Sequence, residues 1–100
     1  MTSQLIEILF VSRSGNDMVM VLDSPIYHVQ NVNDPGQAME MLRDGQIGII
    51  LLEDELFSKD INRMVKEIKR RVPLLPVLVL SENTDTAYQT GLMEAGADDI

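Results

Sequence analysis

Apolar residues in this chain are gathered into short runs of strand length, and the densest run, residues 47–52, lies near the middle of the sequence. It is rich in Ile and Leu and is followed at once by Glu53, Asp54 and Glu55. Such a run is typical of a central parallel strand that is buried on both faces. Similar runs predict further strands at residues 5–11 and 76–80, and residues 98–100 begin a fifth. Residues 26–32 alternate between apolar and polar side chains, which predicts a half-covered strand toward the edge of the sheet.

Between these strands the apolar residues recur at spacings of three and four, which is the period of a helix with one buried side. The expected helices are one that begins at Asn33-Asp34-Pro35 and ends at Gly45, one capped by Ser58 or Asp60 that ends near Pro73, and one opened by Thr84 or Asp85 and closed by Gly96. Residues 17–23 could be a short helix or a strand, and we expect a short helix. These ends combine side-chain caps with Pro and Gly stop signals.

The alternation of strand and helix predicts a three-layer α/β fold of the flavodoxin-like type, with a parallel sheet and right-handed crossovers. The expected strand order is 2-1-3-4-5, and the chain ends at or in the fifth strand, so residues 1–100 form a single domain without a C-terminal helix. In such sheets, ligands bind beyond the carboxyl ends of the strands. The acids at 53–55 therefore occupy the place where a site is expected.

Composition narrows the class of protein. The chain has 100 residues, is 45% hydrophobic and 24% charged, and has a net charge of −8 with a pI near 4.4. An acidic balance of this size argues against a nucleic-acid or anionic membrane surface, because phosphate groups bind to clustered Lys and Arg. No cysteine, basic leader or long apolar span is present. We expect a cytoplasmic protein that binds neither nucleic acid nor membrane.

The sequence has two candidate functional features, a cluster of basic residues and a single histidine, and both are better explained as ordinary surface features. A basic cluster on one predicted helix is interrupted by acids, which favours a solvated helix face over a binding patch; its members are Arg63, Lys66, Lys69, Arg70 and Arg71. His28 has no Ser, Asp or second His at catalytic spacing. No nucleophile–base pair or metal cluster is visible, so we predict no enzyme activity, cofactor or metal.

The C-terminal third carries a more specific signal. The segments Pro76-Val77-Leu78-Val79-Leu80-Ser81 and Gly91-Leu92-Met93-Glu94-Ala95-Gly96-Ala97-Asp98-Asp99-Ile100 closely resemble the receiver domains of two-component response regulators. The resemblance implies that Ser81 stands at the switch hydroxyl position, which hydrogen-bonds a phosphoryl group. It places Glu53 at the position of the phospho-acceptor aspartate.

Several positions depart from the receiver pattern. The resemblance implies an acidic pair after the first strand that holds Mg²⁺, but this chain has Ser12 and Arg13 there. Glu53 is one methylene longer than the usual aspartate, which misplaces in-line attack on a phosphodonor. The family's lysine after the fifth strand would fall beyond Ile100. The resemblance therefore implies a pseudo-receiver with a degenerate phosphorylation site.

Three interpretations of the acidic strand end remain open. Glu53 could form an ion pair with Arg13 and act as a fixed negative charge. It could instead be an ordinary solvated acid. Asp54 could be a displaced acceptor, although neighbouring strand residues point to opposite faces.

A second family competes over the middle of the chain. Asn33-Asp34-Pro35 with its Ala38-containing helix, and Ile47-Gly48-Ile49-Ile50-Leu51 before Glu53-Asp54-Glu55-Leu56, resemble the F subunit of archaeal-type and vacuolar-type rotary ATPases. That resemblance implies a central-stalk protein that is coupled to proton or sodium transport. The chain lacks the Gly-Phe-Arg-Leu-type segment and the Ile-Pro-Ser of that family, which favours the receiver.

The receiver interpretation also makes a prediction about partners. With a short first helix and no last helix, apolar residues of the first and third strands are expected to be exposed on one sheet face. Such a face indicates a fragment of a longer protein, a homodimer or a docked partner, of which we favour the first two. Expected partners are signalling proteins or the chain's own output domain.

Overall fold

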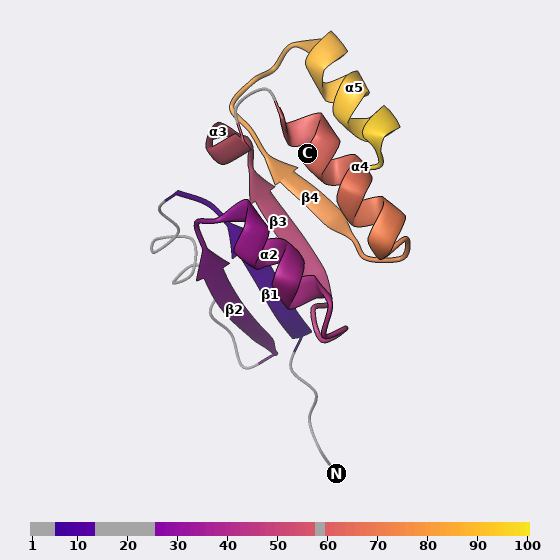
Figure 1. Ribbon diagram of the computed structural model, residues 1–100. Coiled ribbons are helices and arrows are strands. Elements are labelled where there is room, and N and C mark those ends of the chain that lie inside the picture. The colour runs from indigo at the N-terminus through magenta and orange to yellow at the C-terminus, as the bar shows by residue number, and fades with distance from the viewer. Residues whose placement is uncertain (1–5, 14–25, 58–59) are drawn as a thin grey trace.

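The computed structural model describes residues 6–13, 26–57 and 60–100. The expected helix at residues 17–23 and the alternative cap at Ser58 lie outside these ranges. The described elements are β1 (Ile6–Val11), β2 (Tyr27–Val32), α2 (Pro35–Leu42), β3 (Ile49–Glu53), α3 (Asp54–Phe57), α4 (Ile61–Arg71), β4 (Val77–Leu80) and α5 (Thr86–Ala95). Apart from the additional turn α3, their order matches the predicted alternation of strands and helices (Figure 1).

The four strands form one parallel sheet in the order β2-β1-β3-β4. A single parallel bridge between Leu78 and Asp99 places the end of the chain beside β4. The Val79 amide donates to the Asp99 carbonyl at 3.1 Å, and the Asp98 amide donates to the Val77 carbonyl at 2.8 Å. These bonds place the end of the chain where the fifth strand was predicted, and the predicted flavodoxin-like fold is confirmed.

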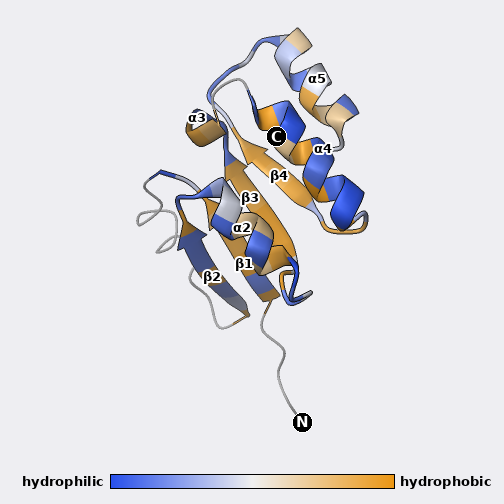
Figure 2. Cartoon of the chain, in the orientation of Figure 1, coloured by the Kyte–Doolittle hydropathy of each residue, from blue (hydrophilic) through white to orange (hydrophobic). Residues whose placement is uncertain are grey.

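The main core lies between the sheet and the helices. Figure 1 shows α2 and α4 on the same face of the sheet, with α5 beside α4. Alternate strand residues such as Leu9, Ile50 and Val79 are fully buried against this layer. Burial of a side chain of this size stabilises the fold by about 1.5–3 kcal/mol. In Figure 2, β1, β3 and β4 are largely hydrophobic, whereas the edge strand β2 is hydrophilic over most of its length.

The opposite face of the sheet corrects one prediction. Ile8, Phe10 and Leu51 project to this face, and all three are buried, with exposed fractions of 4%, 1% and 7%. The expected exposure of the first and third strands is therefore wrong at their centres. The physical reason is that partly buried neighbours on β2, β3 and β4 pack against these three side chains: Tyr27, Val29, Ile49, Leu78 and Leu80.

Local signals explain the helix ends. The Asp34 carboxylate accepts the Gly36 amide at 3.0 Å and caps α2, in which Pro35 is the first residue. Asp60 precedes α4 but makes no side-chain cap bond. The single helical turn α3 was not predicted. Acids favour the first turn of a helix, and Asp54 and Glu55 begin α3 directly after Glu53 ends β3.

Candidate functional site

A hollow of about 440 Å³ opens at the carboxyl ends of β3 and β4, at the edge where parallel sheets bind ligands. It contains the predicted acceptor position, Glu53, and the predicted switch hydroxyl position, Ser81. Its lining residues are Glu53, Asp54, Glu55, Val79, Leu80, Ser81, Glu82 and Ile100. The structure thus brings together two of the four residues singled out from the sequence.

Glu53 is the last residue of β3 and lies opposite Leu80 in the register with β4. Its side chain is half-buried. Within residues 6–13, 26–57 and 60–100 it makes no ion pair and no side-chain hydrogen bond. A carboxylate in this position adds negative charge to the hollow.

Asp54 has a specific partner that the sequence did not reveal. The Tyr88 hydroxyl on α5 donates to the Asp54 carboxylate at 2.8 Å, across 34 positions of the sequence. Burial and this neighbouring carboxylate together raise the pKa of Tyr88 to about 12, while a hydrogen bond with Ser81 acts in the opposite direction. The bond links the start of α3 to the first turn of α5 beside the hollow. Asp54 is the first residue of a helix, so the alternation of side chains along a strand does not determine where its carboxylate points.

Ser81 takes part in a series of caps that leads from β4 to α5. Its hydroxyl oxygen accepts the Asn83 amide at 3.0 Å, and the Asn83 side chain accepts the Asp85 amide at 2.9 Å. Asp85 then caps α5 by accepting the amides of Ala87 at 2.8 Å and Tyr88 at 3.3 Å. The predicted helix start at Asp85 is confirmed. The Ser81 oxygen therefore has a local structural function at the rim of the hollow.

Ser12 and Arg13 do not line this hollow. Ser12 is fully buried, and its hydroxyl oxygen accepts the Asn31 side-chain amide at 2.9 Å. Arg13 is exposed. The hypothesis of a Glu53–Arg13 ion pair is wrong: in the described part of the chain, no ion pair involves either residue. An exposed guanidinium gains little from such a pair, because water already solvates its charge.

The residues at this edge do not fit the magnesium site that the receiver fold implies. That ion requires clustered oxygen ligands in near-octahedral geometry. The position after β1 instead offers a hydroxyl already bound to Asn31 and a cation at Arg13. Across the described residues, no group of three or more acidic or His side chains is arranged to hold a metal ion. No step through a metal follows from this arrangement.

The Gly96–Asp98 part of the receiver-like motif has a structural function. Gly96 ends α5 with φ of 121°, a backbone conformation that favours glycine. One Asp98 oxygen accepts the Val77 amide at 2.8 Å and pairs with the Lys69 ammonium at 2.7 Å. Lys69 and this backbone bond hold the pKa of Asp98 below its usual value. The motif thus fastens the C-terminal segment to α4 and β4.

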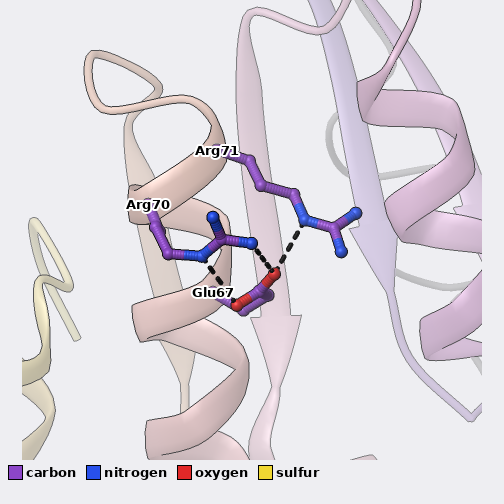
Figure 3. Close-up of polar contacts among 3 residues, drawn as sticks. All are labelled: Glu67, Arg70 and Arg71. Atoms are coloured by element: carbon purple, nitrogen blue, oxygen red, sulfur yellow. Dashed lines mark hydrogen bonds and ion pairs between the residues drawn. The ribbon is translucent and has the colours of Figure 1, made fainter.

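His28 and part of the basic cluster on α4 also have structural partners. His28 on β2 lies 2.8 Å from the Glu7 carboxylate, and this hydrogen bond lowers the pKa of Glu7. On α4, Glu67 lies between the guanidinium groups of Arg70 and Arg71, at 2.7 and 2.8 Å (Figure 3). Hydrogen bonds from these arginines, Arg70 first, lower the pKa of Glu67 to about 2. The basic cluster is therefore partly neutralised.

Comparison with known proteins identifies the fold. Neither protein-family models nor curated proteins match the sequence. Solved structures of response regulators do match. HP1043, an orphan response regulator of H. pylori, is 18% identical with a TM-score of 0.82 over 94% of this chain and 79% of its own. A Thermotoga maritima response regulator is 19% identical, with a TM-score of 0.83 over 95% and 82% of the two chains. The chemotaxis response regulator CheY4 of Vibrio cholerae is 20% identical, with a TM-score of 0.80 over 96% and 84%.

The fold of this chain is that of response regulator receiver domains, as the sequence resemblance implied. The structural neighbours give no support to the rotary ATPase F subunit. In the described part of the chain, every helix is too short or too polar to cross a bilayer.

Proposed function

We propose that this chain is a non-catalytic protein-interaction domain in signal transduction, built on the receiver fold with a degenerate phosphorylation site. The observation that carries the proposal is the asymmetry of the carboxyl edge. The β3 side presents the acids Glu53, Asp54 and Glu55, whereas the β1 side presents the buried Ser12 and the cation Arg13. Phosphoryl transfer at this edge would need acidic groups on both the β1 side and the β3 side, and only the β3 side is acidic here.

The chemistry of the individual side chains supports the same conclusion. A glutamate at the acceptor position carries its oxygens one methylene farther from the strand than an aspartate does, and small displacements of a nucleophile greatly slow phosphoryl transfer. The β1 side supplies no carboxylate to hold a counter-ion for charge that develops on the transferred group. The domain therefore acts through its surfaces. Its partners are signalling proteins or an attached output domain in the cytoplasm.

Phosphodonor incubation followed by intact-mass spectrometry tests this function. The chain is incubated with acetyl phosphate or phosphoramidate in the presence of Mg²⁺, beside the double variant R13D/E53D as the matched control. We expect no phosphoryl adduct on the unaltered chain, and an adduct at position 53 only in the double variant. A stoichiometric phosphoryl adduct on the unaltered chain, whether acid-stable or an acyl phosphate, would overturn the proposal.

A further inference from the structure

A groove runs between α2 and α4 on the helical face of the sheet, away from the carboxyl-edge hollow. Both helices pack on the sheet, and α4 also lies against α3 and α5. Two adjoining hollows of about 470 and 360 Å³ occupy the space between α2 and α4, and Arg71 lines both. We call this space the α2–α4 groove.

The floor of the groove is apolar and its rim is cationic. Leu56, Phe57 and Met64 form apolar lining in the larger hollow. Arg63 lines that hollow, and Arg43 lines the smaller one at the C-terminal end of α2. This combination is suited to a ligand with both apolar and anionic groups.

The arginines of the rim have unused hydrogen-bonding capacity. Within the described ranges, the guanidinium groups of Arg43 and Arg63 have no hydrogen-bond or ion-pair partner. Arg71 commits only its Nε to Glu67, and Figure 3 shows its two terminal nitrogens directed away from that carboxylate. Guanidinium forks bind carboxylates in a bidentate manner, so these groups are ready to receive acidic side chains.

The acids near the groove do not cancel this charge. Glu67 is already bonded to Arg70 and Arg71, which leaves Asp60 as the other acid in the lining. Asp60 lies at the start of α4, where the helix dipole favours a negative charge. The unpaired cations at opposite ends of the groove therefore remain available.

The charge distribution of the whole chain selects an acidic ligand. The net charge is −8, yet six of the eight Lys and Arg residues lie on α4 or at the adjoining end of α2; they are Arg43, Arg63, Lys66, Lys69, Arg70 and Arg71. An acidic partner is repelled by the rest of the surface and attracted here, which fixes its place and orientation.

We propose that the α2–α4 groove binds an acidic amphipathic helix of a partner protein. Apolar side chains at helical spacing would pack on Leu56, Phe57 and Met64, and flanking Glu or Asp would bind Arg43, Arg63 and Arg71. The eight residues of α2 span about 12 Å at 1.5 Å per residue, which accommodates about two turns of such a helix. The inference rests on the proposed function only in that the domain binds proteins.

A synthetic probe tests the groove directly. The probe is a fluorescein-labelled helical peptide with Leu and Phe at i, i+4 and i+7 and Glu at the flanking positions, and the control peptide has Gln in place of Glu. Anisotropy titration measures affinity, and backbone NMR shifts locate the site. We expect saturable binding of the Glu peptide, weaker binding of the Gln peptide, and shifts that cluster on α2, α3 and α4.

Matched variants distinguish the groove from a general basic surface. R43E/R63E should lower the affinity for the Glu peptide by about tenfold or more, because the charges at both ends of the groove are reversed. K66E is the control, since Lys66 is an exposed α4 cation that lines neither hollow, and it should change affinity by less than about twofold. Circular dichroism confirms that each variant is folded.

Three results would overturn the proposal: no saturable binding of the Glu peptide, equal affinities for R43E/R63E and the unaltered chain, or preferential binding of a single-stranded oligonucleotide that K66E weakens equally. The last outcome would indicate a general basic surface on α4. None of these measurements uses Mg²⁺ or a phosphodonor. Failure of the groove therefore leaves the phosphorylation result unchanged, and the two proposals fail separately.

Discussion

Replacement of Asp98 tests why the receiver-like motif is needed for stability. One Asp98 oxygen accepts the amide of Val77, a fully buried residue, and pairs with Lys69, whose side chain is 20% exposed. In D98A the Val77 amide loses its acceptor, which costs about 1–3 kcal/mol. Loss of the half-exposed ion pair adds at most about 1 kcal/mol. Because Asp98 is itself 48% exposed, water can reach part of this site, and we expect a total of about 2 kcal/mol.

D98N separates the hydrogen bond from the charge. An asparagine oxygen can still accept the Val77 amide, so this variant loses only the ion pair with Lys69 and should cost less than about 1 kcal/mol. Urea unfolding followed by circular dichroism at neutral pH measures both changes in the free energy of unfolding. For a chain of this length the total is roughly 5–15 kcal/mol, so a loss of about 2 kcal/mol is readily measured.

The pH dependence of stability provides a second readout. In the folded chain, the hydrogen bond from Lys69, and then that from the Val77 amide, lower the pKa of Asp98 below its ordinary value of 3.8. A carboxyl group with a lowered folded pKa stabilises the protein above its unfolded pKa, and this stabilisation is lost as the pH falls through the folded value. D98N should remove that part of the acid sensitivity. If D98N proved as destabilising as D98A, or if D98A cost less than about 0.5 kcal/mol, the hydrogen-bond argument would be refuted.

Other substitutions test contacts around α5. Y88F removes the hydrogen bond to Asp54 and should destabilise the chain by about 1 kcal/mol; ultraviolet titration should also lose a phenol with a pKa near 12, and loss of a phenol with an ordinary pKa in Y88F would contradict the contact. G96A places a side chain at φ of 121° and a Cβ 2.9 Å from Lys69 Cγ, so urea unfolding should show a loss of about 1–3 kcal/mol. An unchanged midpoint for G96A would show that α5 ends differently.

The strands were predictable because their signal is local. Residues 47–52 and 76–80 are apolar over the length of a strand, and the structure places β3 and β4 within them or one residue beyond. Helix ends were predictable where a side-chain cap is nearby in sequence, as at Asp34 and Asp85. The turn α3 was missed because Asp54 and Glu55 fit both a strand end and a first helical turn.

Contacts between distant residues of the candidate site were not predictable from the sequence. The Tyr88–Asp54 bond spans 34 positions, and no periodicity indicates that α5 directs a phenol toward α3. The same limit explains the incorrect Glu53–Arg13 ion pair, which assumed that side chains at neighbouring strand ends meet. Asp98 was identified from the family motif, and only the structure reveals its bonds to Val77 and Lys69.

The central claim is that the carboxyl edge has lost its metal-dependent chemistry, and Mg²⁺ titration followed by backbone NMR tests it most directly. For the unaltered chain we predict no saturable shifts at Glu53, Asp54 or Ser81, because the position after β1 supplies Ser12 and Arg13 in place of the carboxylates that Mg²⁺ requires. R13D/E53D should gain a saturable response at these positions. Saturable Mg²⁺ binding at this edge in the unaltered chain would contradict the account.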